Sequence, residues 1–158
     1  MLSFWLSAAL AAEVLIPSAT PLTPDDFAIA ESFYRQVVAA SLQAGLAVED
    51  ADGIRVWAGA DAENCFDTES CPNSLWGRTD ARVALVMRVG KGTSGTLVEV
   101  RLFAPDDPTP LKVMRETVQP GKEASFSAKL ALTTQEVLSI TPERTAPKPP
   151  DNPQTVVT

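Results

Sequence analysis

The sequence contains no histidine and only two cysteines among its 158 residues. Without histidine, a Ser-His-Asp or Cys-His catalytic group cannot form, and neither can a histidine metal site. Two thiols alone supply too few ligands for zinc. The composition therefore excludes the histidine-dependent hydrolases and the common zinc proteins, and we predict no cofactor and no metal site.

Basic residues are also scarce. Thirteen Lys and Arg stand against 20 Asp and Glu, which gives a formal net charge of −7, and the basic residues occur singly and never in runs. The surface as a whole repels phosphate backbones and anionic lipids. We predict no nucleic-acid partner. The chain is 45% apolar, which suits one domain with its own core.

The N-terminus begins with the apolar run MLSFWLSAALAA, and no Lys or Arg precedes Arg35. Ala9-Leu10-Ala11 has the small-x-small pattern of a signal-peptidase site. We predict that residues 1–12 are a signal peptide or leader and that the protein is periplasmic or secreted. The alternative is a buried first strand or helix of a cytosolic domain. The run is too short for a permanent transmembrane helix, so we do not predict an integral membrane protein.

Cys65 and Cys71 are separated by five residues within an acidic loop. This spacing differs from the redox C-x-x-C motif, and a structural disulfide is the simplest interpretation. Such a bond requires an oxidising compartment and would contribute about 2.4 kcal/mol in the chain-entropy model. The alternative is a pair of free thiols in a cytosolic protein.

The acidic loop around the cysteines has two further interpretations. Its carboxylates are suitable ligands for a loosely bound calcium ion, although they lack EF-hand spacing, and a solvated loop is the preferred interpretation. These residues are Asp61, Glu63, Asp67 and Glu69. Trp57 and Trp76 flank the loop. They either line a ligand groove or pack on the disulfide and the sheet, and we favour packing.

The clearest predicted element is a helix over residues 23–45. Thr23 is a candidate N-cap, Pro24 suits the first helical position, and Gly45 stands where a C-terminal glycine belongs. Two apolar stripes overlap along the helix, one beginning at Phe27 and one that includes Phe33. A helix this apolar is expected to pack against a sheet.

Alternating apolar residues predict strands over 81–89, 96–103 and 111–118, and short apolar runs predict strands near residues 13–19 and 45–50. In the first of these, the inward set predicted by alternation is Val83, Leu85, Met87 and Val89, against Ala84, Val86 and Arg88. Brief helices are predicted near 50–60 and 71–81, and a longer one over 121–140. We therefore predict an α/β (α+β) fold, with one mixed sheet of about four to five strands packed by two to three helices, and a C-terminal hairpin and helix.

Gly90, Gly92 and Gly95 have the spacing G-x-G-x-x-G. In a dinucleotide-binding protein this motif opens a helix, but here a strand follows it. A protein kinase would also need an H-R-D and a D-F-G motif, and the sequence has neither. We interpret the motif as a β-hairpin loop in which glycine permits positive φ, and we predict no nucleotide partner.

From residue 141 the chain has five prolines in 18 residues, which predicts a disordered tail or linker over 141–158. The α/β domain is accordingly assigned to residues 13–140. Its order of elements, from EVLIPSA through the long helix and the cysteine pair to the hairpin RVALVMRVGKGTSGTLVEVRLF, resembles the amino-terminal domain of TolB and the CsgG-like assembly factors. The resemblance implies a bacterial envelope domain and supplies no catalytic residues.

These features together predict a non-enzymatic secreted or periplasmic module that binds an envelope protein or takes part in envelope assembly. Two alternatives remain open. One is a small ligand-sensing domain or hydrolase that uses acidic residues near Trp57 and Trp76, and the other is a fragment of a larger envelope protein.

Overall fold

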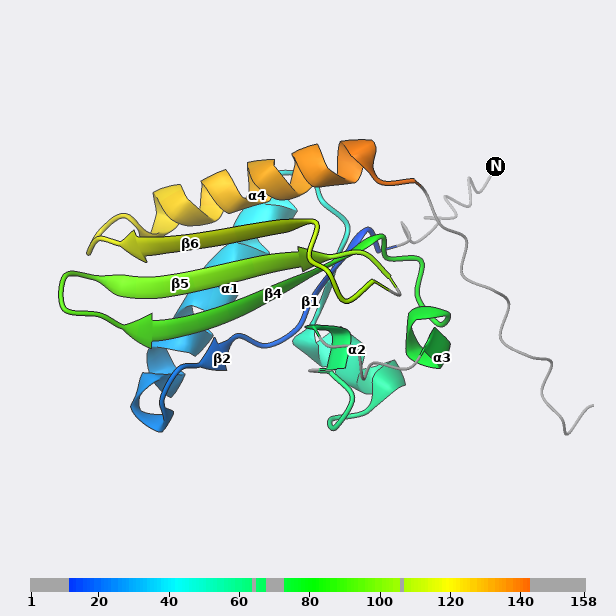
Figure 1. Ribbon diagram of the computed structural model, residues 1–158, viewed down its shortest axis with the longest axis horizontal. Coiled ribbons are helices and arrows are strands. Elements are labelled where there is room, and N and C mark those ends of the chain that lie inside the picture. The colour runs from blue at the N-terminus through cyan, green and yellow to red at the C-terminus, as the bar shows by residue number, and fades with distance from the viewer. Residues whose placement is uncertain (1–11, 64, 68–72, 106, 143–158) are drawn as a thin grey trace, which may run out of the picture.

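The computed structural model describes residues 12–63, 65–67, 73–105 and 107–142 (Figure 1). The strands are β1 (Val14–Ile16), β2 (Thr20–Pro21), β3 (Val48–Asp50), β4 (Val83–Lys91), β5 (Thr96–Phe103) and β6 (Lys112–Val118). The helices are α1 (Phe27–Gln43), α2 (Ala51–Ala58), α3 (Asn73–Trp76) and α4 (Glu123–Ile140). Two short 3-10 helices are η1 (Pro24–Asp26) and η2 (Cys65–Asp67).

All the strands belong to one mixed sheet with the order β3-β1-β4-β5-β6, and the short β2 pairs with β4 beyond the end of β1. β1 runs parallel to β3 and β4, whereas β4, β5 and β6 form an antiparallel meander. The predicted fold class is confirmed. The two-residue β2, which the sequence did not reveal, brings the sheet to six strands.

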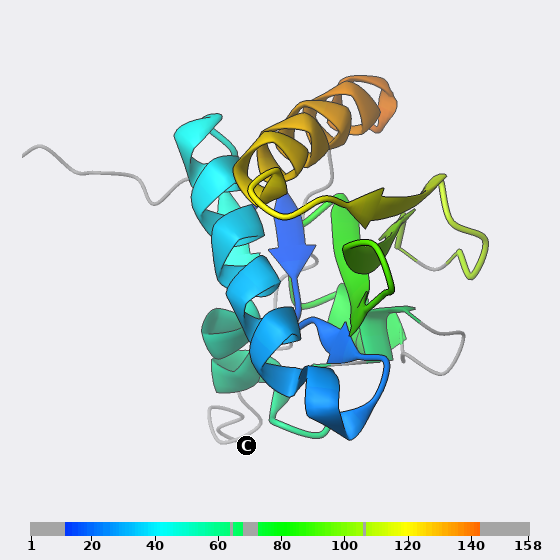
Figure 2. The same ribbon diagram turned by 90° about the vertical axis from the view of Figure 1, so that its left-hand side faces the viewer.

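One face of the sheet is covered by α1 and α4, which pack against each other (Figure 2). The rings of Phe33 and Phe126 meet edge to face, with centroids 6.1 Å apart. The inward residues of β4 are those that alternation predicted, and they lie in this core: Val83, Leu85, Met87 and Val89. Burial of these aliphatic side chains supplies the main stabilisation of the fold.

The opposite face is covered only in part. α2, η2 and α3 gather at the end of the sheet near β1 and form a second, smaller core there (Figure 1). Phe66 is at its centre and packs edge to face on Trp76, with ring centroids 5.0 Å apart. Because these short helices cover one end only, part of the β4–β5–β6 face remains solvent-accessible.

The ends of the two long helices are fixed by specific polar contacts. The Asp26 carboxylate accepts hydrogen bonds from the Thr23 hydroxyl at 2.9 Å and from the backbone N–H of Lys91 at 3.1 Å. Thr23 is thus the N-cap of η1, and η1 leads directly into α1, whose own N-cap is Asp26. Gly45 adopts φ 85° just after α1, as predicted for a C-terminal glycine. At the end of α4, Arg82 donates to the carbonyl oxygens of Leu138 and Thr141.

The glycine motif lies in the β4–β5 hairpin, as predicted, but the expected reason for its glycines is wrong. Positive φ occurs instead at Gly45, Gly59 and Gly121. Glycine is needed in the hairpin because other atoms approach closely. A methyl group at Gly90 would lie 2.5 Å from the Leu22 side chain, and one at Gly95 would lie 2.4 Å from the carbonyl oxygen of Val118. The motif serves packing of the sheet.

Within the described residues, every helix is too short or too polar to cross a lipid bilayer. The predicted leader falls outside the described residues except for its last residue. The predicted tail falls outside them after residue 142. Both segments, and the boundaries of the domain, stay predictions.

Candidate functional site

A crevice of about 540 Å³ lies at the carboxyl ends of β1 and β3. The chain leaves β1 toward β3 through α1 on one face of the sheet, and it returns toward β4 through α2 on the other face. Doubly wound sheets bind ligands at such a switch point. Residues from the β1–β2 segment, α1, α2 and the following loop line it: Ser18, Ala19, Thr20, Pro21, Phe27, Glu31, Tyr34, Arg35, Ala51, Asp52, Arg55 and Glu63.

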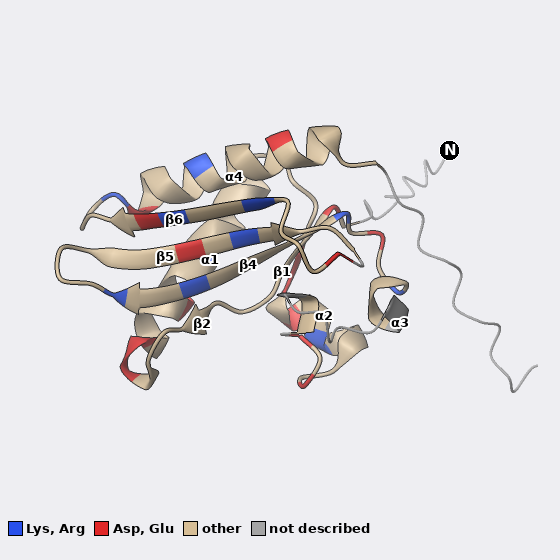
Figure 3. Cartoon of the chain, viewed as in Figure 1, with Lys and Arg blue, Asp and Glu red and all other residues tan. Residues whose placement is uncertain are grey.

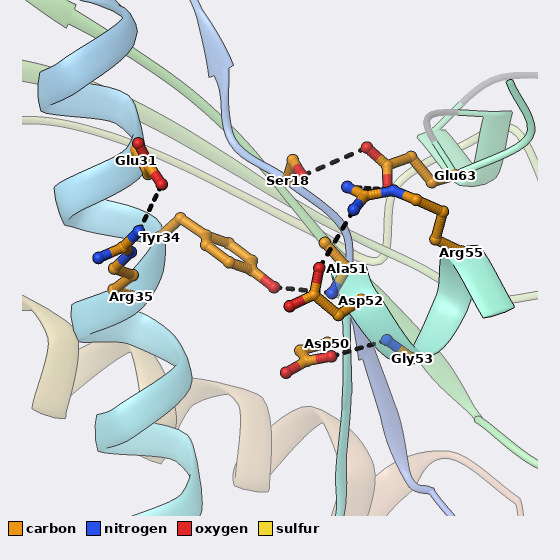
Figure 4. Close-up of polar contacts among 10 residues, drawn as sticks. All are labelled: Ser18, Glu31, Tyr34, Arg35, Asp50, Ala51, Asp52, Gly53, Arg55 and Glu63. Carbon is orange, nitrogen blue, oxygen red and sulfur yellow. Dashed lines mark hydrogen bonds and ion pairs between the residues drawn. The ribbon is translucent and has the colours of Figure 1, made fainter. Parts of the chain in front are cut away.

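The charged side chains of the crevice are all paired with one another (Figure 4). Arg55 binds Asp52 and Glu63, each at 3.1 Å, and Glu63 also accepts a hydrogen bond from the Ser18 hydroxyl at 3.3 Å. At the rim, Arg35 pairs with Glu31 four residues earlier in α1. The Glu63 side chain is only 10% exposed, so its partners compensate for the burial of its charge.

The N-terminus of α2, where a helix can bind an anion, is satisfied by the chain itself. Asp50 caps it by accepting a hydrogen bond from the N–H of Gly53 at 2.9 Å. The Tyr34 hydroxyl accepts one from the N–H of Ala51 at 2.7 Å (Figure 4). Burial raises the pKa of Tyr34 above its usual value, while the hydrogen bond from Ala51 opposes that rise. Tyr34 therefore stays a neutral acceptor at physiological pH.

The crevice provides little for covalent chemistry. The Ser18 hydroxyl donates a hydrogen bond to Glu63, but that carboxylate already binds the Arg55 guanidinium. A serine nucleophile needs a general base that is free to take its proton. The arrangement is therefore a network of structural ion pairs, open to solvent on one side.

The second candidate surface is the uncovered part of the sheet, called here the open face. It consists of the outward residues of three strands: Arg88 in β4; Leu97, Glu99 and Arg101 in β5; Val113, Arg115 and Thr117 in β6. A shallow groove of about 370 Å³ crosses it. Leu22, at the end of β2, forms one wall and is 52% exposed.

Among the open-face residues, three arginines, in β4, β5 and β6, stand against the single carboxylate of Glu99. Figure 3 marks the basic residues of these strands in blue and the acidic ones of β5 and β6 in red. Glu99 binds Arg101 through one oxygen at 2.9 Å and Arg115 through the other at 2.7 Å. The hydrogen bond from Arg115 is the main cause that lowers the pKa of Glu99, against the effect of burial. Among the described residues, no carboxylate forms an ion pair with Arg88.

The outer edge of β6 adjoins the open face. In the sheet order β6 is terminal and pairs only with β5 in the described part of the chain. Its outward residue Val113 is 41% exposed, equal to Leu97 on the neighbouring strand. Edge strands and exposed apolar side chains are features of surfaces that bind other polypeptides.

The residues predicted from the sequence as candidate site residues lie elsewhere. Cys65 begins η2, whereas Cys71 lies outside the described residues, so their disulfide stays a prediction. Trp76 is 3% exposed and belongs to the second core, as the packing interpretation predicted. Trp57 also packs on Phe66, and its indole N–H donates to Glu49 at 3.0 Å.

The acidic loop does not gather around a metal in the described residues. Glu69 lies outside them, and Glu63 is directed into the crevice, toward Arg55. Within the described ranges, no group of three or more His, Cys, Asp or Glu side chains is arranged to hold a metal ion.

Comparisons with known proteins concern the fold. No protein-family model matches the chain, and no curated protein matches it. The chain is a mixed α/β domain. Its fold is similar to that of the lipoprotein GNA1162 from Neisseria meningitidis, with a TM-score of 0.51 and 18% identity over 81% of this chain and 94% of that one.

Two further solved structures are more distant. The PelC dodecamer from Paraburkholderia phytofirmans is 16% identical over 81% of this chain and 89% of that one, with a TM-score of 0.43. LpoB from E. coli is 13% identical over 69% of this chain and 58% of that one, with a TM-score of 0.34. The likeness to GNA1162 therefore establishes the fold, and the resemblance to TolB and CsgG-like factors stays a prediction.

Proposed function

We propose that this protein is a non-enzymatic binding or assembly module of the bacterial cell envelope, and that it is periplasmic or secreted. The similar fold of a lipoprotein supports this proposal, as do the predicted leader and the predicted disulfide. The observation that carries it is the contrast between the two surfaces. The charges of the crevice are all engaged in ion pairs with one another, whereas the open face presents exposed leucine, valine and arginine side chains beside a strand edge.

This contrast supports the open face as the proposed binding surface. A catalytic crevice requires groups that are free to act on a substrate, and Arg55 and Glu63 are bound to each other. A partner that covers the open face would instead bury Leu97 and Val113 without breaking any described ion pair of the crevice. Burial of exposed apolar area is the main favourable term in protein association.

Two pairs of substitutions test the proposal in cells of the source organism. The full-length tagged protein is cross-linked with formaldehyde and purified from the envelope fraction. We expect a specific cross-linked partner with the native chain and with the crevice pair Arg55→Gln and Glu63→Gln, and its loss with the face pair Leu97→Ser and Val113→Ser. Circular dichroism checks that each variant is folded.

The opposite pattern would contradict the proposal. If the crevice pair loses the partner and the face pair keeps it, the ligand-sensing or hydrolase alternative is favoured. Recovery of the folded native protein only from the cytoplasm would contradict the envelope location and remove the compartment that the disulfide requires.

A further inference from the structure

Arg88 is an exposed charge within β4, flanked on both sides by buried residues of the strand. The five preceding residues of β4 are buried, and so are the two that follow Arg88. In the register of the β4–β5 pair, Arg88 lies directly opposite Glu99. Opposite charges at such positions normally form a stabilising cross-strand pair. Here, Glu99 is paired instead with its neighbours: Oε2 accepts a hydrogen bond from Arg115, and Oε1 lies within ion-pair distance of Arg101 without a well-aligned hydrogen bond.

The open face therefore carries three guanidinium groups around a single carboxylate, in a chain whose net charge is −7. The guanidinium of Arg88 remains available, and a planar guanidinium binds carboxylates with two parallel hydrogen bonds. An anionic group that enters the groove would meet Arg88 without displacing an existing ion pair.

The walls of the groove restrict the occupant further. Leu22 and Leu97 are 52% and 41% exposed, and they line the same groove as Arg88. An acidic polysaccharide has no aliphatic groups to bury against them. An anionic membrane would approach the whole molecule, whose net charge repels it. A polypeptide segment can present a carboxylate and aliphatic side chains together, in a groove of about 370 Å³.

We propose that the groove of the open face binds a segment of a partner protein in which an acidic residue adjoins aliphatic residues. The carboxylate binds Arg88, and the aliphatic side chains contact Leu22 and Leu97. This inference rests on the proposed function, because it specifies the chemistry of the partner that the envelope module binds.

Nuclear magnetic resonance of the full-length, ¹⁵N-labelled protein tests it with defined probes. The first is a soluble peptide of alternating glutamate and leucine, and the second has lysine in place of glutamate. We expect the glutamate peptide to cause saturable shifts of the amides of Leu22, Arg88 and Leu97. We expect Arg88→Gln to weaken its binding roughly tenfold, as for loss of one charge-assisted hydrogen bond. The matched control Arg35→Gln, an exposed arginine of α1, should leave the affinity unchanged.

Several results would overturn the inference. These are equal binding of the two peptides, equal affinity of native and Arg88→Gln proteins, and absence of saturable shifts. Binding of polygalacturonate or of phosphatidylglycerol vesicles through Arg88, without peptide binding, would assign the face to another class of partner. Shifts at the same amides on dilution without peptide would assign it to a second copy of this chain. If cross-linked partners still depend on Leu97 and Val113 while the glutamate peptide does not bind, the proposed function stands and this inference fails.

Discussion

The Tyr34 hydroxyl lies 2.7 Å from the backbone nitrogen of Ala51 and accepts its hydrogen bond, which ties the middle of α1 to the first turn of α2. Tyr34→Phe removes the acceptor and leaves a partly buried N–H without it. We expect a loss of about 1–2 kcal/mol in the free energy of unfolding, measured by urea denaturation. An unchanged free energy would mean that water replaces the hydroxyl at no cost and that the contact is not structural.

Acid should destabilise the protein through Asp26. Its pKa is lowered below the ordinary value of 3.8, chiefly by the hydrogen bond from the Thr23 hydroxyl and also by the N–H of Lys91. A carboxyl group with a lowered pKa in the folded state stabilises the fold above its unfolded pKa, and the contribution is lost as the pH falls through the folded pKa. We expect Asp26→Asn to be less stable near neutral pH and to lose less stability below about pH 4.

Urea unfolding at a series of pH values measures this difference. Glu99, whose pKa is also lowered, leaves a residual acid dependence in the variant. Identical pH profiles for the native protein and Asp26→Asn would contradict the assignment of Asp26 as the carboxylate that joins α1 to β4.

The hairpin glycines should be sensitive to added volume. A methyl group at Gly95 would meet the backbone of β6, which cannot move without disturbing the strand pairing. Gly95→Ala should therefore lower stability by roughly 1–3 kcal/mol. Gly59→Ala is a useful comparison, because Gly59 has φ 87° and no atom near its missing side chain. We expect this variant to lose about 1 kcal/mol. A smaller effect at Gly95 than at Gly59 would contradict the close-approach explanation.

The buried face could be predicted from the sequence for the strands but not for the long helix α1. Alternation identified the inward residues of β4 and β5 because side chains of a strand point to opposite faces with a period of two. In α1 the two apolar stripes overlapped, and only the packing against the sheet and α4 decided between them: Phe33 is buried, whereas Phe27 is 63% exposed. A helix that is apolar on most sides does not define its own buried face.

The candidate sites could not be predicted from the sequence, because they depend on contacts between residues of different elements. Arg55 and Glu63 meet because a loop returns Glu63 to the crevice. The sequence did place Arg88 on the outward side of its strand. It did not indicate that Glu99 would pair with Arg101 and Arg115, since those contacts depend on the register of three strands. The two-residue β2 is too short to produce an alternating pattern.

The predicted disulfide between Cys65 and Cys71 has a clear test. Cys65 precedes Phe66, whose ring packs between Trp57 and Trp76 at centroid distances of 5.9 and 5.0 Å. Replacing both cysteines with serine should lower the melting temperature and decrease the free energy of unfolding by about 2 kcal/mol. Partner binding should stay nearly intact. Mass spectrometry of the unreduced, exported protein should find two hydrogens fewer than in the reduced chain. Two alkylatable thiols in that sample would contradict the bond.

Site-specific photo-cross-linking in living cells tests the central claim most directly, because it locates the partner on the surface. A photoreactive amino acid is placed at Val113 on the open face, or at Phe27 on the rim of the crevice, both of which are solvent-exposed. Our account predicts a discrete protein adduct from position 113, and none from position 27. An adduct from position 27 alone would contradict it and would move the binding site to the crevice.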